Sequence, residues 1–234
     1  MNSDAHPASQ PAPAGWIDAA LLSFVAAFVD TACFIGLFGL FTAHVTGNFV
    51  LIGAALVGGD TAIVGKLLAL PVFALAVAAT ALVSGRLRTV SRSPLAPLLV
   101  VQALLLAAAA LSVLVMPAPR SGNDGGTLVI GMLAVVAMGL QNALMRLELS
   151  ALPPTTVMTG NVTQVVIDLV AAHGAAAPGA VQVARLRIRK QAPGLLAFAG
   201  GAAAGALVFA WVGLLSLAIP ALLCLGLAWR WRAA

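Results

Sequence analysis

The stretch LAPLLVVQALLLAAAALSVLVM, residues 95–116, decides the fold class, because it contains no charged residue and is long enough to cross a lipid bilayer. A membrane-spanning helix needs about 20 mostly apolar residues. Five further stretches meet this requirement, and together they predict six transmembrane helices, over residues 16–40, 62–84, 95–116, 127–149, 193–212 and 214–231. The last two belong to one apolar stretch, which we divide at Gly213 because a single helix of that length would overshoot the bilayer.

The composition agrees with this class of protein. Hydrophobic residues make up 62% of the 234-residue chain and charged residues 8%, whereas soluble domains have about 45–50% and 25%. We therefore expect an all-α integral membrane protein with one membrane domain over residues 16–234. Residues 1–15 are polar and rich in Pro, Ala and Ser, which predicts a disordered tail and not a cleaved signal peptide.

Two apolar segments are too short to span and predict broken or re-entrant helices, over residues 44–57 and 157–172. Each carries the tripeptide Thr-Gly-Asn near its start, at residues 46–48 and 159–161. A polar residue stands in the preceding long helix at nearly the same distance from each tripeptide, Asp30 in the first half and Asn142 in the second. These matched features indicate an internal duplication, with repeats over about 16–116 and 127–232.

The basic residues predict the orientation of the two repeats. They lie in clusters that we assign to loops between apolar runs, at Arg86, Arg88 and Arg92, at Arg185, Arg187, Arg189 and Lys190, and at Arg230 and Arg232. Basic loops of membrane proteins stay in the cytoplasm. All three clusters share one side only if the Thr-Gly-Asn segments do not cross. The sequence thus predicts a 3+3 inverted repeat with both termini cytoplasmic and only Lys66 and Arg120 outside.

The string Phe28-Val29-Asp30 followed by Phe41-Thr42-Ala43-His44-Val45-Thr46-Gly47-Asn48 resembles the YoaK family of bacterial inner-membrane proteins. Met158-Thr159-Gly160-Asn161 and the chain length also fit, so the likeness covers nearly the whole chain. The family is known chiefly as a domain of unknown function. The resemblance implies a multi-pass protein of the bacterial inner membrane with a compact fold of several helices, and it supplies neither a substrate nor a reaction.

The two helix breaks are the principal candidate site. Unsatisfied backbone groups survive at membrane depth only inside protein or beside water, and inverted-repeat transporters bind substrate where broken helices meet. We expect both tripeptides to line a shared cavity near the midplane, with the Thr and Asn side chains capping freed amides. The alternative is that each tripeptide simply caps a helix after a loop. The candidate residues are Thr46, Gly47, Asn48, Thr159, Gly160 and Asn161.

Further polar residues are candidates for the same cavity. A carboxylate as deep as Asp30 is costly in a membrane, so it either titrates or binds a cation, or else hydrogen-bonds to fasten helices. Asn142 would be its uncharged counterpart. His44 could titrate near neutral pH or be held in the loop. Asn161, Gln164 and Asp168 share one helix face, which lines either the cavity or the interface. Gly200, Gly201 and Gly205 predict close helix packing.

These features favour a small transporter or channel for a small polar solute, with proton coupling through Asp30 as a further hypothesis. The alternatives are a non-transporting membrane scaffold or sensor and an intramembrane enzyme that uses Asp30 and His44. We expect no enzyme and no cofactor or metal, because the sequence has no metal-ligand spacing, phosphate loop or nucleophile elbow. Expected partners are the lipid bilayer and an unidentified polar solute, but not nucleic acid. A homo-oligomer is compatible with the sequence.

Overall fold

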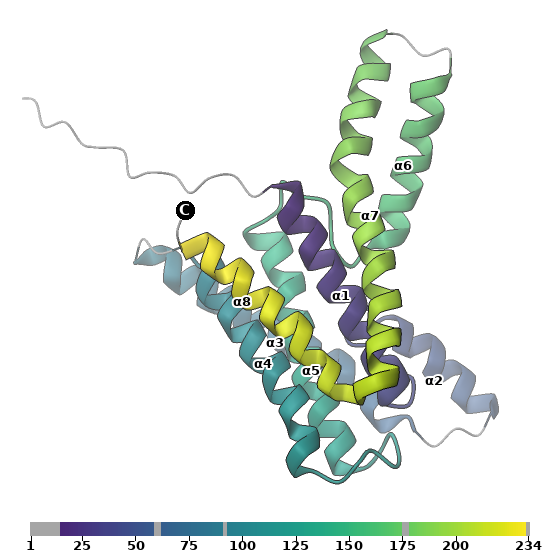
Figure 1. The fold of residues 1–234 in the computed structure, drawn as a ribbon, viewed down its shortest axis with the longest axis vertical. Coiled ribbons are helices and arrows are strands. Elements are labelled where there is room, and N and C mark those ends of the chain that lie inside the picture. The colour runs from purple at the N-terminus through teal and green to yellow at the C-terminus, as the bar shows by residue number, and fades with distance from the viewer. Residues whose placement is uncertain (1–14, 59–61, 91–92, 175–177, 233–234) are drawn as a thin grey trace, which may run out of the picture.

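The structure, a computed structural model, describes residues 15–58, 62–90, 93–174 and 178–232 (Figure 1). Every regular element in these ranges is a helix, and no described residue lies in a strand. The all-helical fold class is therefore confirmed. The predicted disordered tail lies outside the described residues except for Gly15, as do Arg92 and both chain ends.

Five stretches are long and apolar enough to cross a membrane. Four of them are single helices, α1 (Trp16–Gly36), α3 (Val64–Thr89), α4 (Leu95–Val115) and α5 (Gly125–Leu147). The fifth, Gly179–Arg232, contains nearly all of α7 (Pro178–Val212), the short 3-10 helix η1 (Gly213–Leu217) and α8 (Ala218–Arg232). The chain is thus a multi-pass helical protein of the membrane type.

The last apolar stretch divides at Gly213, as predicted. Helix α7 ends at Val212, and Gly213 has a φ of 60°, a left-handed conformation that favours glycine. The chain turns sharply there, so that α8 runs back along the body (Figure 1). The predicted final helix over 214–231 is only partly right, because its first residues form η1 and α8 begins at Ala218.

Two other predicted boundaries were wrong. Helix α1 ends at Gly36 and not at residue 40, because Phe38 and Gly39 have positive φ values of 56° and 79° that a right-handed helix cannot contain. Helix α7 starts at Pro178 and not at residue 193, and it includes Pro193 in its interior. Hydropathy detects only the apolar part of α7, whereas its polar first half is stabilised by packing against α6 (Met158–His173).

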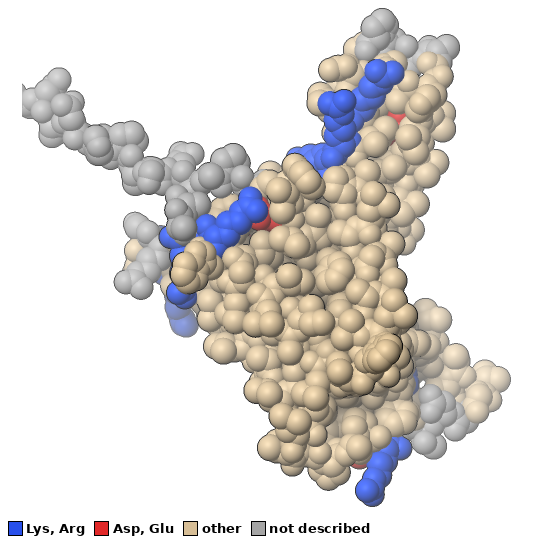
Figure 2. All heavy atoms as spheres, in the orientation of Figure 1, with Lys and Arg blue, Asp and Glu red and all other residues tan. Residues whose placement is uncertain are grey.

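The basic clusters therefore lie on helices, and their assignment to loops was wrong. Arg86 and Arg88 are in the last turn of α3, and Arg230 and Arg232 are in the last turn of α8. The cluster that begins at Arg185 lies on the first half of α7. On the face drawn in Figure 2, charged side chains gather towards the two ends of the molecule and leave an uncharged belt between them.

Ion pairs show which helix ends lie together. Arg230 is 3.7 Å from Asp18 in the first turn of α1, and Arg88 is 2.9 Å from Glu148 at the end of α5. Gln141 near the end of α5 also donates to the carbonyl of Leu22 near the start of α1 at 2.8 Å, so the start of α1 and the ends of α3, α5 and α8 share one end of the molecule, which we call the basic end. Helix α1 runs away from the basic end, whereas α3 and α5 run towards it.

The long helices pair across the two halves of the sequence. Helix α1 packs mainly against α7, and α3 packs against α5. Both pairs are parallel, because Gly201 and Gly205 of α7 meet Phe24 and Phe28 of α1 in the same order. In the second pair, Gly65 of α3 lies beside Leu128 of α5, and Gly139 of α5 lies beside Ala76 further along α3. The two pairs therefore run in opposite directions.

Two short helices begin at the Thr-Gly-Asn tripeptides and leave the body in different directions (Figure 1). Helix α2 (Gly47–Gly58) starts within the first tripeptide, and α6 contains the second tripeptide in its first turn. Both are shorter than α1, α3, α4 and α5, in agreement with the sequence. Each follows an irregular segment, residues 37–46 before α2 and residues 148–157 before α6, which we call the first and second connectors.

Candidate functional site

Asp30 fastens the first connector to α1. Its Oδ1 accepts hydrogen bonds from the backbone amides of Thr42 at 2.6 Å and Ala43 at 2.7 Å, and from the Thr42 hydroxyl at 3.0 Å. Its Oδ2 lies 2.6 Å from Nδ1 of His44. The carboxylate is 5% exposed, so it provides acceptors to backbone amides that have no water there. The deep acidic residue thus replaces the hydrogen bonds that the helix break removes.

Asn142 and Gln141 fasten the second connector to α5 in a similar way. The Thr156 hydroxyl donates to Oδ1 of Asn142 at 2.6 Å, and Nε2 of Gln141 donates to the Thr155 hydroxyl at 3.2 Å. Asn142 precedes Thr156 by the same fourteen positions that separate Asp30 from His44. The local hydrogen bonding is therefore duplicated together with the tripeptides.

The asparagine of each tripeptide reaches back to its own connector. Asn48 Nδ2 donates to the carbonyl of Phe41 at 2.9 Å, and Oδ1 accepts from the Phe41 amide at 3.0 Å. Asn161 Nδ2 donates to the carbonyl of Pro154 at 2.8 Å, again seven residues earlier. The expectation that these side chains cap the freed helix amides is therefore wrong for both asparagines, because they shape the connectors instead.

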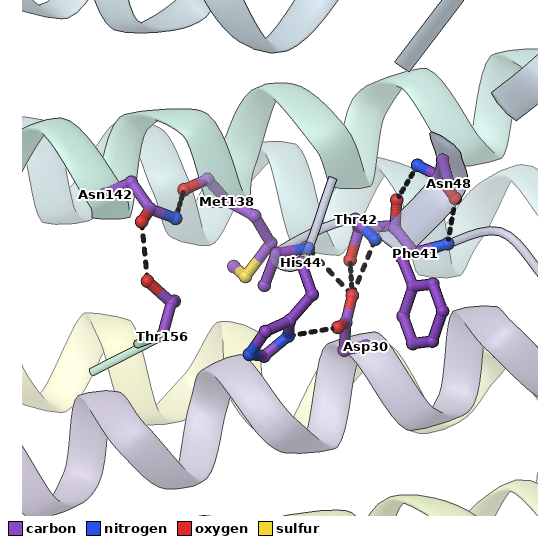
Figure 3. Close-up of polar contacts among 9 residues, drawn as sticks. Asp30, Phe41, Thr42, His44, Asn48, Met138, Asn142 and Thr156 are labelled. Atoms are coloured by element: carbon purple, nitrogen blue, oxygen red, sulfur yellow. Dashed lines mark hydrogen bonds and ion pairs between the residues drawn. The ribbon is translucent and has the colours of Figure 1, made fainter. Parts of the chain in front are cut away.

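His44 belongs to the first connector, and its side chain lies between Asp30 of α1 and the second connector (Figure 3). Besides its contact with Asp30, the imidazole is in reach of the backbone carbonyl of Thr156 on the second connector. Its ring also meets the ring of Phe198 on α7 edge-on, with centroids 5.6 Å apart and planes at 83°. In Figure 3 the Asn142–Thr156 pair lies to one side of His44 and the Asp30 group to the other.

Two cavities meet at His44 and Phe198. The first cavity has a volume of about 530 Å³ and is lined mainly by α1, the first connector and α7, through Ala27, Asp30, Thr31, Phe34, Phe41, His44 and Phe198. The second has a volume of about 440 Å³ and lies between the two connectors, lined by Ala43, His44, Val45, Thr46, Leu70, Phe73, Asn142, Thr156, Val157, Met158, Thr159 and Phe198. Both volumes are large enough for a small organic solute.

Five of the eleven predicted residues line these cavities. Thr46 and Thr159, one from each tripeptide, are exposed and line the second cavity together with Asn142 and His44. Asp30 and His44 line the first. Asn48 of α2 and Asn161 of α6 are buried, line neither cavity and hydrogen-bond to their connectors. Their role in a functional site stays a prediction.

The two glycines of the tripeptides differ in their surroundings. A Cβ atom at Gly47 would lie 2.8 Å from the Phe41 ring, so the first connector needs glycine there. A Cβ atom at Gly160 would meet only the Val157 side chain at 3.9 Å. Gly47 therefore serves close packing, and Gly160 has room for a side chain.

Gln164 and Asp168 are not brought to the cavities. Gln164 Nε2 donates to Oδ1 of Asp168 at 3.1 Å, and Arg187 of α7 lies 3.5 Å from the same oxygen. These contacts join α6 to the polar half of α7, and neither residue lines either cavity. They fit the interfacial reading of the predicted polar stripe better than the cavity reading.

The sequence reasoning missed Phe198 and Phe73, which contribute aromatic rings to the cavity walls. A signal for them exists. Phe73 opens the string FALAVAATALV at residues 73–83 of α3, and Phe198 opens FAGGAAAGALV at residues 198–208 of α7. The two strings share their first two and last three residues as well as the central Ala-Ala pair. This second repeat unit equates α3 with α7.

The arrangement provides hydrogen-bonding groups and no charged side chain from Lys or Arg. The second cavity offers the hydroxyls of Thr46 and Thr159, the amide of Asn142 and the imidazole of His44. No group of three or more His, Cys, Asp or Glu that could hold a metal ion was found among the described residues. The thiols of Cys33 and Cys224 are buried and unpaired by disulfide.

One comparison with known proteins identifies the family. No curated protein and no solved structure matches the chain. The sequence profile of one family, described as protein of unknown function (DUF1275), matches residues 19–229 and so covers nearly the whole chain. The resemblance to the YoaK family is thereby confirmed. With its helical membrane-type fold and its duplicated connectors, the chain belongs to this family of membrane proteins of unknown function.

Proposed function

We propose that the chain crosses the membrane six times as a 3+3 inverted repeat, with α1, α3 and α4 in the first half and α5, α7 and α8 in the second. Three observations support this arrangement. The connector hydrogen bonds recur at equal spacing, the FA…AA…ALV string recurs in α3 and α7, and the α1–α7 and α5–α3 pairs run in opposite directions. With basic residues inside, both termini are cytoplasmic.

With this arrangement of helices, the protein moves a small polar solute across the bacterial inner membrane. The observation that carries this proposal is the second cavity. There the first and second connectors converge and present polar groups between the apolar helices. Non-helical backbone within the hydrocarbon layer is tolerated where it lines a water-filled cavity. Transporters with inverted repeats bind their substrates in such places. A scaffold needs no cavity of this kind.

The solute that suits this cavity is neutral or carries a single negative charge. Helices α2 and α6 both start at the cavity wall, so the positive ends of two helix dipoles point towards it. In α2 the first amides are already bonded to the carbonyls of residues 44–46. In α6, among the described residues, the first amide with a backbone acceptor is that of Asn161. The amides of residues 158–160 therefore lie where a solute oxygen would be bound.

The contact between Asp30 and His44 supports a second candidate, an intramembrane enzyme. A carboxylate that orients an imidazole is the arrangement of a general base. The hydroxyl of Thr156 on the second connector donates to Asn142 and not to His44, so it is not activated by this pair. The transport proposal accounts for the polar residues of both connectors, whereas the enzyme proposal accounts only for the contact between Asp30 and His44.

Uptake into proteoliposomes tests the proposal. The purified protein is reconstituted and assayed with radiolabelled urea, glycerol, glycine, acetate and lactate, against protein-free vesicles. We expect uptake of at least one of these probes, and its loss in the double variant Thr46→Val, Thr159→Val, which removes only the two cavity hydroxyls. The matched control is Thr163→Val, because that exposed hydroxyl of α6 bonds to a carbonyl of its own helix. Uptake that is absent for every probe, or equal in both variants, contradicts the proposal.

A further inference from the structure

Phe198 is the large residue in a row of glycines on α7. Positions 194, 198, 201 and 205 share one face of the helix by their spacing. A Cβ atom at Gly201 would overlap the carbonyl oxygen of Phe24, and one at Gly205 would lie 2.7 Å from that of Phe28. A Cβ atom at Gly194 would lie 3.5 Å from the Ser23 hydroxyl. The backbones of α1 and α7 therefore touch on the C-terminal side of Phe198, and on its N-terminal side Gly194 lies beside the Ser23 side chain.

This packing holds the Phe198 ring at the boundary between the two cavities. Phe198 and His44 are the residues that line both of them. Their rings meet at 5.6 Å, and Asp30 holds the imidazole through a 2.6 Å contact. The boundary thus consists of one ring fixed by α1 and the first connector and one ring carried by α7.

The two cavities lie towards opposite ends of the molecule. Thr31 and Phe34 of the first cavity are in the last two turns of α1, which runs away from the basic end. Asn142 of the second cavity is in the last turns of α5, which runs towards the basic end. Figure 3 shows the same order, with His44 between Asn142 and Asp30.

We infer that Phe198, in contact with His44, is the internal gate of the transport path, and that the two cavities open to opposite faces of the membrane. This inference rests on the proposed transport function and assigns its gating residue. Hydrophobic constrictions close a path by excluding water, and a passage through this boundary requires only that the ring of Phe198 move away from His44. Phe73, which stands at the equivalent place on α3 and lines the second cavity, is the corresponding residue of the other repeat.

Cysteine labelling from each face tests the gate without knowledge of the solute. Thr31→Cys places a thiol in the first cavity and Thr159→Cys places one in the second, each in a Cys33→Ala, Cys224→Ala background. The probe is 2-sulfonatoethyl methanethiosulfonate, an anion that does not cross lipid, applied to right-side-out and to inside-out vesicles. We expect each thiol to react from one face only, and the two to react from opposite faces.

The variant Phe198→Ala should then let each thiol react from both faces. Phe49→Ala is the matched control, because Phe49 is exposed on α2 and lines neither cavity. If Phe198→Ala fails to fold, as judged by gel filtration, Phe198→Leu replaces it and should give partial labelling from the second face.

Reaction of both thiols from the same face, or unchanged sidedness in the folded Phe198 variant, overturns the inference. The proposed function fails separately. Labelling of each thiol from one face only, in a way that depends on Phe198, together with no uptake of any solute, would support the gate and exclude transport of the probes tested. If the protein takes up a solute but Phe198→Ala does not change the face from which each thiol is labelled, the transport function stands and the gate is excluded.

Discussion

The sharpest test of the fold is a pair of neighbouring glycines on α7. Gly200 and Gly201 are adjacent in a helix, yet a Cβ atom at Gly200 would have no atom within 4 Å, whereas one at Gly201 would overlap the Phe24 carbonyl oxygen and lie 2.9 Å from the Phe24 Cα. Contacts with backbone cannot be relieved by a rotamer change. Alanine at Gly201 therefore has to push α1 and α7 apart by about 1 Å to bring its Cβ to an ordinary contact distance from the Phe24 carbonyl oxygen.

The expected free energies of unfolding follow from these distances. Gly200→Ala should stabilise the protein by about 0.5–1 kcal/mol, because alanine loses less backbone entropy in a helix. Gly201→Ala has the same entropic gain but adds an overpacking cost of about 1–3 kcal/mol along the longest interface of the fold. The prediction that glycines 200, 201 and 205 form one packing face is thereby corrected, since Gly200 lies outside the contact.

Unfolding in detergent micelles, titrated with dodecyl sulfate and followed by far-UV circular dichroism, measures both variants. We expect Gly200→Ala above the wild type and Gly201→Ala below it, roughly 1–3 kcal/mol apart. Equal stability of the two variants, or a more stable Gly201→Ala, would show that α1 and α7 do not approach as closely as described. Phe198 would then have no fixed position against His44.

Two further changes probe the connectors and the loop before α5. Asp30→Ala leaves the buried amides of Thr42 and Ala43 without an acceptor and should lower the free energy of unfolding by about 2–6 kcal/mol, while Asp30→Asn keeps an acceptor oxygen and should fold. If Asp30 couples to protons, Asp30→Asn loses the pH dependence of uptake, and an unchanged pH profile would exclude coupling. At the N-cap of α5, the backbone amides of Thr127 and of residues 120 and 121 hold the pKa of the Asp124 carboxyl below its usual range. Its stabilising effect is complete above the ordinary carboxyl pKa of about 4 and is lost as the pH falls through the lower folded-state pKa. Asp124→Asn should therefore have a lower Tm than the wild type at pH 7, with a difference that narrows below pH 4; a constant difference would contradict the assignment.

The sequence predicted the features that depend on local pattern. The lengths of the apolar stretches predicted the long apolar helices. The turn at Gly213, where φ is positive, was predicted from a glycine inside an apolar run too long for one helix. The paired tripeptides indicated two short helices because a polar break in hydrocarbon needs a compensating structure. The depth of Asp30 indicated that it faces a cavity or a partner, and in the structure it does both.

Other features depended on tertiary contacts that no local pattern encodes. The end of α1 at Gly36 follows from the path of the first connector, and the polar half of α7 is helical because α6 packs along it. The sequence placed Asn48 as a cap, but its partner is the backbone of Phe41, seven residues earlier. Phe198 was missed because a phenylalanine in an apolar helix looks like core until its place between two cavities is known.

The crossed pairing of the long helices has a consequence for biosynthesis. Among the described residues, α1 makes its main helix contacts with α7, η1, α8 and α5, and Asp30 joins it to the first connector, but no other helix of the first half is a main neighbour. The contact between Phe24 and Gly201 can therefore form only after Gly201 is synthesised, roughly 10–35 s after Phe24 at about 5–20 residues per second. During that time α1, which carries the carboxylate of Asp30 in its C-terminal half, lies in the membrane without the helices that finally surround it. We therefore expect its insertion to depend on membrane insertase, whose depletion should reduce accumulation of this protein more than that of one whose helices pair in order of synthesis.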